Sequence, residues 1–305
     1  MRVPIGLVCV ALLGLAPWVQ VGAQESLPPS FRSGVDLVSV SAVVRDGRGR
    51  LVPELTREDF RVLDGGESRP IIDFWSNGAA AVSVGILLDV SGSMGVGSKM
   101  KDARTTANHL LARLRAGEDE SAIFAFDTQL RVLEPFSSER RHLADTRSDV
   151  HPFGATSLYD AIAETARRLA DRPTTHRAVV VLSDGIDTRS RLTGPEVSAI
   201  ATAIDVPVYL VAVVSPLDHP DAPTATGDAA EGAGRLRDLA RWTGGGVHFA
   251  STPREGSRAM TELLNELRHQ YVLAFEASPQ SGWRLIEVRV DDRRVQTRSA
   301  YQATP

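Results

Sequence analysis

Residues 82–93 read VSVGILLDVSGS, and this stretch decides the fold class. Its first seven residues form a nearly continuous apolar run, which is typical of a parallel strand buried on both faces. Asp89, Ser91 and Ser93 follow at once in an Asp-x-Ser-x-Ser arrangement. Ligands of open α/β sheets bind beyond the carboxyl ends of the strands. The stretch therefore predicts a buried strand that ends in a binding loop.

Apolar strands and amphipathic helices alternate around this stretch, from about residue 80 to residue 270. Further strands are expected at 121–126, 178–182, 208–214 and 247–249, with 129–136 pairing with the first of these as a hairpin. Helices are expected at 98–116, 158–170, 194–204, 236–242 and 255–269. Such alternation predicts a doubly wound, mostly parallel sheet with helices on both faces.

The two flanks of this α/β region are rich in strand patterns. Residues 35–78 and 271–300 alternate apolar and polar positions between Gly-containing turn signals. Each flank has too few strands to be stable alone. We therefore expect the N- and C-terminal flanks to complete one small β-sandwich, with Trp75 and Trp283 in its core or at its seam with the α/β domain.

The first 23 residues have the pattern of a secretory signal peptide. A single Arg2 precedes an apolar stretch that ends at Val21-Gly22-Ala23. An uncleaved membrane anchor is the alternative, but the run is short for a span. Residues 24–34 are expected to be a flexible lead-in. The pattern predicts an exported protein, periplasmic or extracellular, without a membrane span after cleavage.

Composition argues against a nucleic-acid-binding protein and against a protein stabilised by disulfides. The formal net charge is −4, which argues against a nucleic-acid-binding surface. The single cysteine, Cys9, lies in the predicted signal peptide. The mature chain then has no disulfide, so its stability must come from core packing.

Two further polar elements follow predicted strands or precede predicted helices. Thr156 lies just before the helix at 158–170, and Asp184 comes directly after the apolar strand 178–182 in the sequence Leu182-Ser183-Asp184-Gly185. With Asp89, Ser91 and Ser93 they form a set of hard oxygen donors, which is the chemistry that Mg²⁺ prefers.

These elements resemble the metal-ion-dependent adhesion site of von Willebrand factor A (VWA) domains, over roughly residues 80–270. The flanks are similar to a bacterial subfamily of exported VWA-related proteins. The resemblance implies a Mg²⁺ site, with Mn²⁺ or Ca²⁺ as alternatives. It implies that Ser91 and Ser93 bind the ion directly, that Thr156 does so directly or through water, and that Asp89 and Asp184 act through waters or hydrogen bonds. The ion would then accept an Asp or Glu carboxylate from a protein partner.

The leading interpretation is thus a metal-dependent protein-binding module and not an enzyme. A metal-dependent hydrolase is one alternative, but it needs a positioned base, and the motif offers Ser91 no histidine. A structural envelope protein with a vestigial site is the other. The partner, the pathway and the oligomeric state are not indicated.

Several polar residues also have plainer interpretations. Thr156 could be only the cap of the helix at 158–170, and Asp187 a turn or capping residue. Asp218, His219 and Asp221 fit an ordinary surface loop, and His248 fits a packing or rim residue. The loop 215–234 is expected to flank the metal and help select the partner, with a simple spacer as the alternative.

Overall fold

The computed structural model describes residues 37–76, 78, 80–139, 142–143, 151–185, 187–214 and 227–303, and for 227–233 the backbone only. The predicted signal peptide and lead-in therefore lie outside the described residues. Among the described helices, none is both long enough and apolar enough to cross a membrane.

A six-stranded sheet forms the centre of the α/β region. Its strands are β5 (Val82–Asp89), β6 (Glu120–Phe126), β7 (Leu130–Ser137), β8 (His176–Ser183), β9 (Val208–Val213) and β10 (Val247–Ala250). The order is β10-β9-β8-β5-β6-β7, and only the β6–β7 pairing is antiparallel. β5 is thus an interior strand, and all eight of its residues are buried, as its apolar run predicts.

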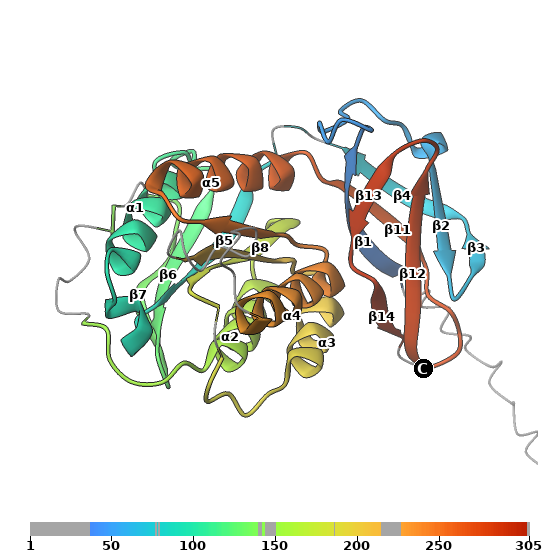
Figure 1. Ribbon diagram of the computed structural model, residues 1–305. Helices are drawn as coiled ribbons and strands as arrows, with labels where there is room; N and C mark the ends of the chain where they lie inside the picture. The colour runs from blue at the N-terminus through green and yellow to red at the C-terminus, as the bar shows by residue number, and fades with distance from the viewer. Residues whose placement is uncertain are drawn as a thin grey trace, which may run out of the picture. The chain divides into compact units, whose positions relative to one another are not determined.

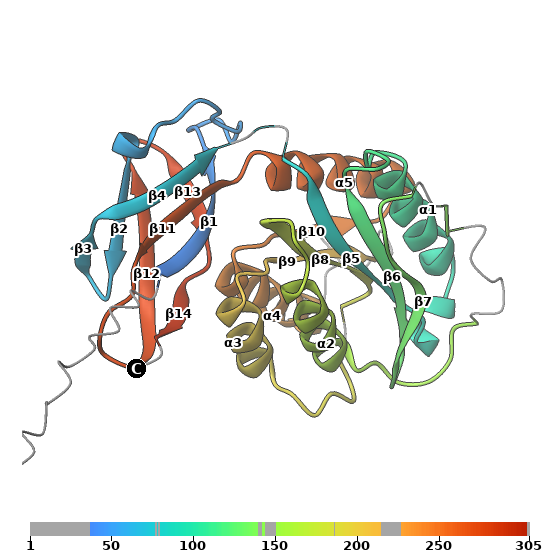
Figure 2. The same cartoon turned by 180° about the vertical axis from the view of Figure 1, so that it is seen from behind.

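Helices cover both faces of this sheet (Figures 1 and 2). α1 (Lys99–Leu111) and α5 (Pro253–Arg268) lie on one face. α2 (Leu158–Ala170), α3 (Gly194–Ala203) and α4 (Gly227–Thr243) lie on the other. Each face has its own apolar core, and alternate residues of β5 point into one or the other. The doubly wound fold expected from the alternation is confirmed.

The flanks form two antiparallel four-stranded sheets, and each sheet takes strands from both ends of the chain. Four strands precede the α/β region: β1 (Leu37–Arg45), β2 (Phe60–Asp64), β3 (Glu67–Arg69) and β4 (Ile71–Ser76). Four follow it: β11 (Tyr271–Glu276), β12 (Gly282–Val290), β13 (Arg294–Thr297) and β14 (Ala300–Ala303). The sheet orders are β13-β1-β11-β4 and β14-β12-β2-β3, with a shared apolar core. The sandwich built from both flanks is confirmed.

Two helix boundaries and the number of strands in the C-terminal flank differ from the expectations. α1 ends at Leu111, not near 116, and the C-terminal flank has four strands instead of two. α4 begins at Gly227, well before the expected 236. The last part of the expected loop 215–234 is therefore helical from Gly227 on, and residues 215–226 lie outside the described residues. The abundance of Pro, Asp and Ala from 215 to 234 had indicated a loop over the whole segment.

The placement of the two tryptophans in the sandwich core is wrong. Trp75 is 48% exposed and Trp283 is 51% exposed. Trp75 lies on β4, which is an edge strand of its sheet. Trp283 alternates with buried positions along β12 and shares the outer face with Leu285. The strand period of two thus places these apolar side chains outside the core.

Candidate metal site

Asp89 is the last residue of β5, and its buried carboxylate joins two neighbouring strands. Its Oδ1 accepts a hydrogen bond from the Ser91 backbone N–H, 2.8 Å away. Its Oδ2 accepts one from the hydroxyl of Ser183, the last residue of β8, at 2.5 Å. Both oxygens are therefore engaged within the protein, which fits a residue that organises the loop.

Ser91 and Ser93 present two hydroxyl groups side by side. Their Oγ atoms are 3.1 Å apart, on the short 3₁₀ turn Gly92–Gly95 that connects β5 to α1. Ser91 is buried and Ser93 is partly exposed. The turn thus offers two neutral oxygens next to the carboxylate of Asp89.

Thr156 lies in the segment that precedes α2, and this segment is tied to the serine turn. The Gly92 N–H donates to the Gly154 carbonyl at 2.9 Å. The Thr156 carbonyl accepts from the backbone N–H groups of Thr188 and Arg189, and the Thr156 N–H donates to the Thr188 hydroxyl. Thr188 therefore fixes the backbone of Thr156 from the loop after β8.

The start of α2 is capped by residues other than Thr156. Asp187 Oδ1 accepts from the Leu158 N–H at 2.8 Å, and the Ser190 hydroxyl accepts from the Tyr159 N–H at 3.0 Å. The interpretation of Thr156 as the helix cap is therefore wrong, because Ser157 holds the N-cap position and the N–H groups of Leu158 and Tyr159 are satisfied from the loop after β8. The capping role expected of Asp187 is confirmed.

Asp184 follows Ser183 directly, and its side chain is only 3% exposed. Its Oδ2 is 3.1 Å from the ammonium nitrogen of Lys99 at the start of α1. Its Oδ1 is buried and has no hydrogen-bond partner among the described residues. A buried, unpartnered carboxylate oxygen is energetically unfavourable unless a further group satisfies it.

The next residue, Gly185, fixes the backbone of this loop. Its φ is +87°, a conformation that side-chain-bearing residues rarely adopt. A Cβ atom at this position would lie 2.6 Å from Cδ1 of Leu236 on α4. Glycine is thus required here both for the turn and for the close approach of the helix.

The electrostatics of the site favour a cation. Burial raises the pKa of Asp89, and the nearby charge of Asp184 adds to this, while hydrogen bonds from Ser183 and Ser91 act in the opposite direction. Within the described residues there is no cluster of three or more His, Cys, Asp or Glu side chains that could hold a metal. An ion at this edge would therefore depend on hydroxyls together with two acids. That donor set, with the unpartnered Asp184 oxygen, fits Mg²⁺, which commonly uses one or two carboxylates and keeps several waters.

Three residues of the site were not identified from the sequence. Ser183 and Thr188 are ordinary hydroxyl residues in loops, and only the three-dimensional structure reveals their partners. Lys99 had a signal that could have been used, because it is one of only two lysines, with Lys101, among 34 basic residues.

Of the other polar residues considered from the sequence, only His248 can be placed. Asp218, His219 and Asp221 lie outside the described residues. His248, on β10, lines a hollow against α5, and burial lowers its pKa. This agrees with a packing or rim residue.

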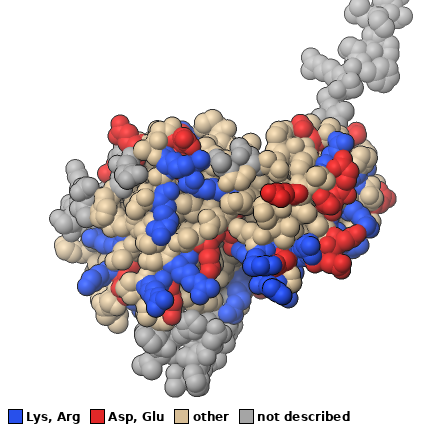
Figure 3. Space-filling model, turned by 90° about the horizontal axis from the view of Figure 1, so that it is seen from above, with Lys and Arg blue, Asp and Glu red and all other residues tan. Residues whose placement is uncertain are grey.

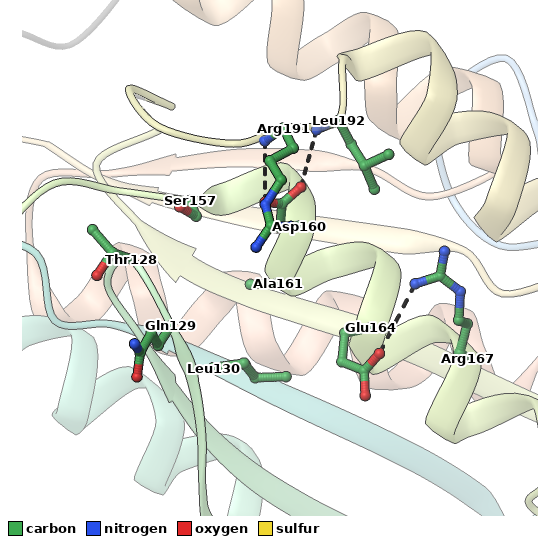
Figure 4. Close-up of a pocket in the computed structure, with 10 residues that line it drawn as sticks. All are labelled: Thr128, Gln129, Leu130, Ser157, Asp160, Ala161, Glu164, Arg167, Arg191 and Leu192. Carbon is green, nitrogen blue, oxygen red and sulfur yellow. Dashed lines mark hydrogen bonds and ion pairs between the residues drawn. The ribbon is translucent and has the colours of Figure 1, made fainter.

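A second hollow of about 580 Å³ lies beside the site (Figure 4). It begins at Ser157, next to Thr156, and has Leu130, Ala161 and Leu192 among its lining residues. Its acids are already engaged: Asp160 accepts from the Arg191 and Leu192 N–H groups, and Glu164 pairs with Arg167 and Arg168. The hollow is therefore a surface feature next to the site and not a second cation site.

Comparisons with known proteins agree with the sequence interpretation. A search of curated proteins gives no match. Three solved structures are partly similar to this chain. A von Willebrand factor type A protein from Catenulispora acidiphila is 13% identical, with a TM-score of 0.49, over 89% of this chain and 74% of the other. An aerotolerance-related membrane protein from Bacteroides fragilis is 17% identical, with a TM-score of 0.49, over 61% and 100%.

A variant of the PilB minor pilin from Streptococcus sanguinis is 14% identical, with a TM-score of 0.46. The match covers 62% of this chain and 62% of the pilin, so the chain spans less than two thirds of that protein. The family model of the von Willebrand factor type A domain matches residues 84–186, a range that includes all five expected site residues. The chain thus contains a von Willebrand factor type A domain, and the resemblance inferred from its motifs is confirmed.

Proposed function

We propose that this chain is an exported protein-binding module that captures a partner's carboxylate through a Mg²⁺ ion. The ion would be held by Asp89, Ser91, Ser93, Thr156 and Asp184. VWA domains mediate protein–protein interactions and are generally non-catalytic adhesion or scaffold modules. The metal dependence, the carboxylate and the export are the parts proposed for this chain.

The observation that carries the proposal is the buried Oδ1 of Asp184, which has no partner within the part of the chain that the structure describes. Asp184 follows β8, and the paired hydroxyls of Ser91 and Ser93 follow β5, the strand that pairs directly with β8. A bound Mg²⁺ would supply a strong positive centre for these oxygens. Since the nearest ligands would be neutral hydroxyls, the ion would keep enough positive charge to attract an external carboxylate.

The protein's own residues would perform distinct tasks at this site. Asp89 orients the serine turn, because one of its oxygens holds the Ser91 N–H and the other holds the Ser183 hydroxyl. Thr188 and the link from Gly92 to Gly154 keep the Thr156 segment beside that turn. Such preorganisation lowers the cost of ordering the site when an ion or a partner binds.

The charge on the face drawn in Figure 3 does not indicate a competing partner. On the face drawn in Figure 3, basic and acidic side chains are interspersed. Arg258 and Glu262 of α5, for example, pair at 2.8 Å. A local carboxylate–metal contact therefore remains the recognition that best fits this chain.

Calorimetric titration with Mg²⁺ and Mn²⁺ tests the site. The wild-type chain should bind one ion, and Asp89→Ala should lose binding while keeping its circular dichroism spectrum. Asp291→Ala, at an exposed acid of the sandwich, is the matched control and should bind as the wild type does. A folded Asp89→Ala variant with unchanged affinity would falsify the assignment.

Capture and export need separate measurements. The immobilised chain should retain an envelope or extracellular protein in Mg²⁺ and release it in EDTA. N-terminal sequencing of exported material should begin at Gln24. Retention that ignores EDTA would contradict metal-mediated capture, and an intact Met1 outside the cytoplasm would contradict the signal peptide.

A further inference from the structure

Lys99 is a cation built into the candidate site by the chain itself. It is the first residue of α1, and its ammonium group is 3.1 Å from Asp184 Oδ2. Its side chain is 19% exposed, so the pair is largely shielded from water. Among the described ion pairs, Lys99 is the only charged partner of Asp184. It lies 85 positions earlier in the chain.

The position and type of this residue are both unusual. A cation at the first residue of a helix is unfavourable, because the helix dipole places partial positive charge there. Of the 34 basic residues in the chain, only Lys99 and Lys101 are lysines. A lysine ammonium is a compact charge on a flexible stem, whereas an arginine forms rigid, bidentate pairs with carboxylates. Lys99 can therefore neutralise Asp184 and still move away from it.

We propose that Lys99 competes with the metal ion for Asp184 and thereby sets the affinity of the site for divalent cations. This inference rests on the proposed function, since it concerns the same site. A divalent ion near Asp184 meets a second positive charge, and the two repel each other. Binding the metal then requires Lys99 to give up part of its contact with the carboxylate. Lys99 makes the site weaker and more readily reversible than its oxygen ligands alone would make it.

Substitution of the two lysines tests this inference with Mn²⁺ as the probe. Lys99→Met removes the charge but keeps an apolar stem of similar length, and it should bind Mn²⁺ roughly tenfold more tightly. Lys99→Arg keeps the charge and pairs more rigidly with the carboxylate, so it should bind Mn²⁺ no more tightly than the wild type. Lys101→Met, at an exposed residue of the same helix, is the matched control and should leave the affinity unchanged. Calorimetry or Mn²⁺ electron paramagnetic resonance measures these affinities.

Thermal unfolding separates competition from a merely structural role. In EDTA, Lys99→Met should unfold at a lower temperature than the wild type, because Asp184 loses its only charged partner among the described residues. In Mn²⁺, the variant should gain more in Tm than the wild type does. A purely structural lysine would lower Tm by the same amount in both conditions.

The outcomes distinguish the inference from the function on which it rests. If the wild type binds Mn²⁺ and Lys99→Met binds it equally or more weakly, the competition is overturned and the metal site stands. If neither the wild type nor any lysine variant binds Mn²⁺, the proposed function itself fails, and the inference fails with it.

Discussion

The two ends of β5 each hold a buried aspartate, but the two carboxylates are satisfied in opposite ways. Asp119 lies at the amino end, where its Oδ1 accepts from the Val82 N–H at 3.1 Å. Two arginines neutralise it: Arg115 at 3.2 Å and Arg268 at 2.6 Å. This acid is a structural element that links β5 to the end of α5.

Asp89 lies at the carboxyl end and has hydrogen bonds but no arginine among the described ion pairs. Its neighbour Asp184 has only Lys99. The sandwich repeats the first pattern, since Asp64 pairs with both Arg69 and Arg284. The two site acids thus differ from Asp119 and Asp64 in having no arginine among the described ion pairs, and this is where the proposed cation would act.

The largest expected effect follows from the loss of the Asp119 carboxylate at the amino end of β5. Asp119→Asn removes the buried negative charge between Arg268 and the partly exposed Arg115 and should lower the unfolding free energy by about 3 kcal/mol. Denaturant unfolding monitored by circular dichroism measures the loss. Asp291→Asn, at an acid that is 80% exposed and pairs only with Arg61, should show no measurable change. Equal stabilities for both variants would contradict the structural role of Asp119.

The next effect concerns the site end, and it depends on the metal. At a Mg²⁺ concentration about 100 times Kd, the wild type should gain about 2.7 kcal/mol of stability by mass action. Asp184→Asn should gain none, because the carboxylate that attracts the ion is gone. Chemical unfolding in Mg²⁺ and in EDTA gives the two values.

Asp102→Asn serves as the control for this measurement, because Asp102 is an acid of α1 that pairs with the Ser98 hydroxyl. It should keep the full Mg²⁺ gain. If Asp184→Asn keeps that gain as well, Asp184 is not part of the metal site, however close it lies to Asp89.

A smaller effect tests how the backbone positions Asp184. Gly185→Ala introduces a Cβ that would lie 2.6 Å from Leu236 Cδ1, at a φ of +87°. We expect a loss of about 1–2 kcal/mol of stability from the backbone strain, together with weaker Mn²⁺ binding. Gly97→Ala has a comparable φ of +64° but no atom within 4 Å of the new Cβ, so it should cost stability without crowding a helix. If both variants bind Mn²⁺ equally well, the contact with α4 does not position the site.

Local sequence patterns account for the parts of this molecule that depend on neighbouring residues. The apolar run 82–88 predicted β5 because burial on both faces leaves a direct mark on composition. The strand-end positions of Asp89 and Asp184 followed from the same pattern, and the flanking strands predicted the sandwich. These are properties of short segments, and the structure agrees with them.

The parts that could not be predicted depend on residues far apart in the chain. The pairing of Asp119 with Arg268 spans 149 positions, and that of Lys99 with Asp184 spans 85. No local pattern distinguishes an aspartate that will meet two arginines from one that will meet a lysine. The start of the helix at Gly227 was missed because the segment was assigned to a loop from its content of Pro, Asp and Ala, and tertiary context can override such local composition.

The smallest expected effect concerns a buried histidine of the scaffold, at the amino end of β8. His176 is buried there, with its Nε2 3.3 Å from the Gln270 carbonyl and its Nδ1 3.0 Å from the Thr175 hydroxyl. Burial lowers its pKa below the ordinary value of 6.5. The unfolded chain therefore binds a proton more readily than the folded one, so stability contributed by the neutral ring is present above pH 6.5 and decreases as the pH falls below it.

His176→Gln has no ring to protonate and should flatten the stability profile between pH 7 and pH 5. Since burial also raises the pKa of Asp89, the comparison is made with an Asp89→Ala background as well. An unchanged slope in His176→Gln on both backgrounds would show that the acid sensitivity of the chain comes from other groups.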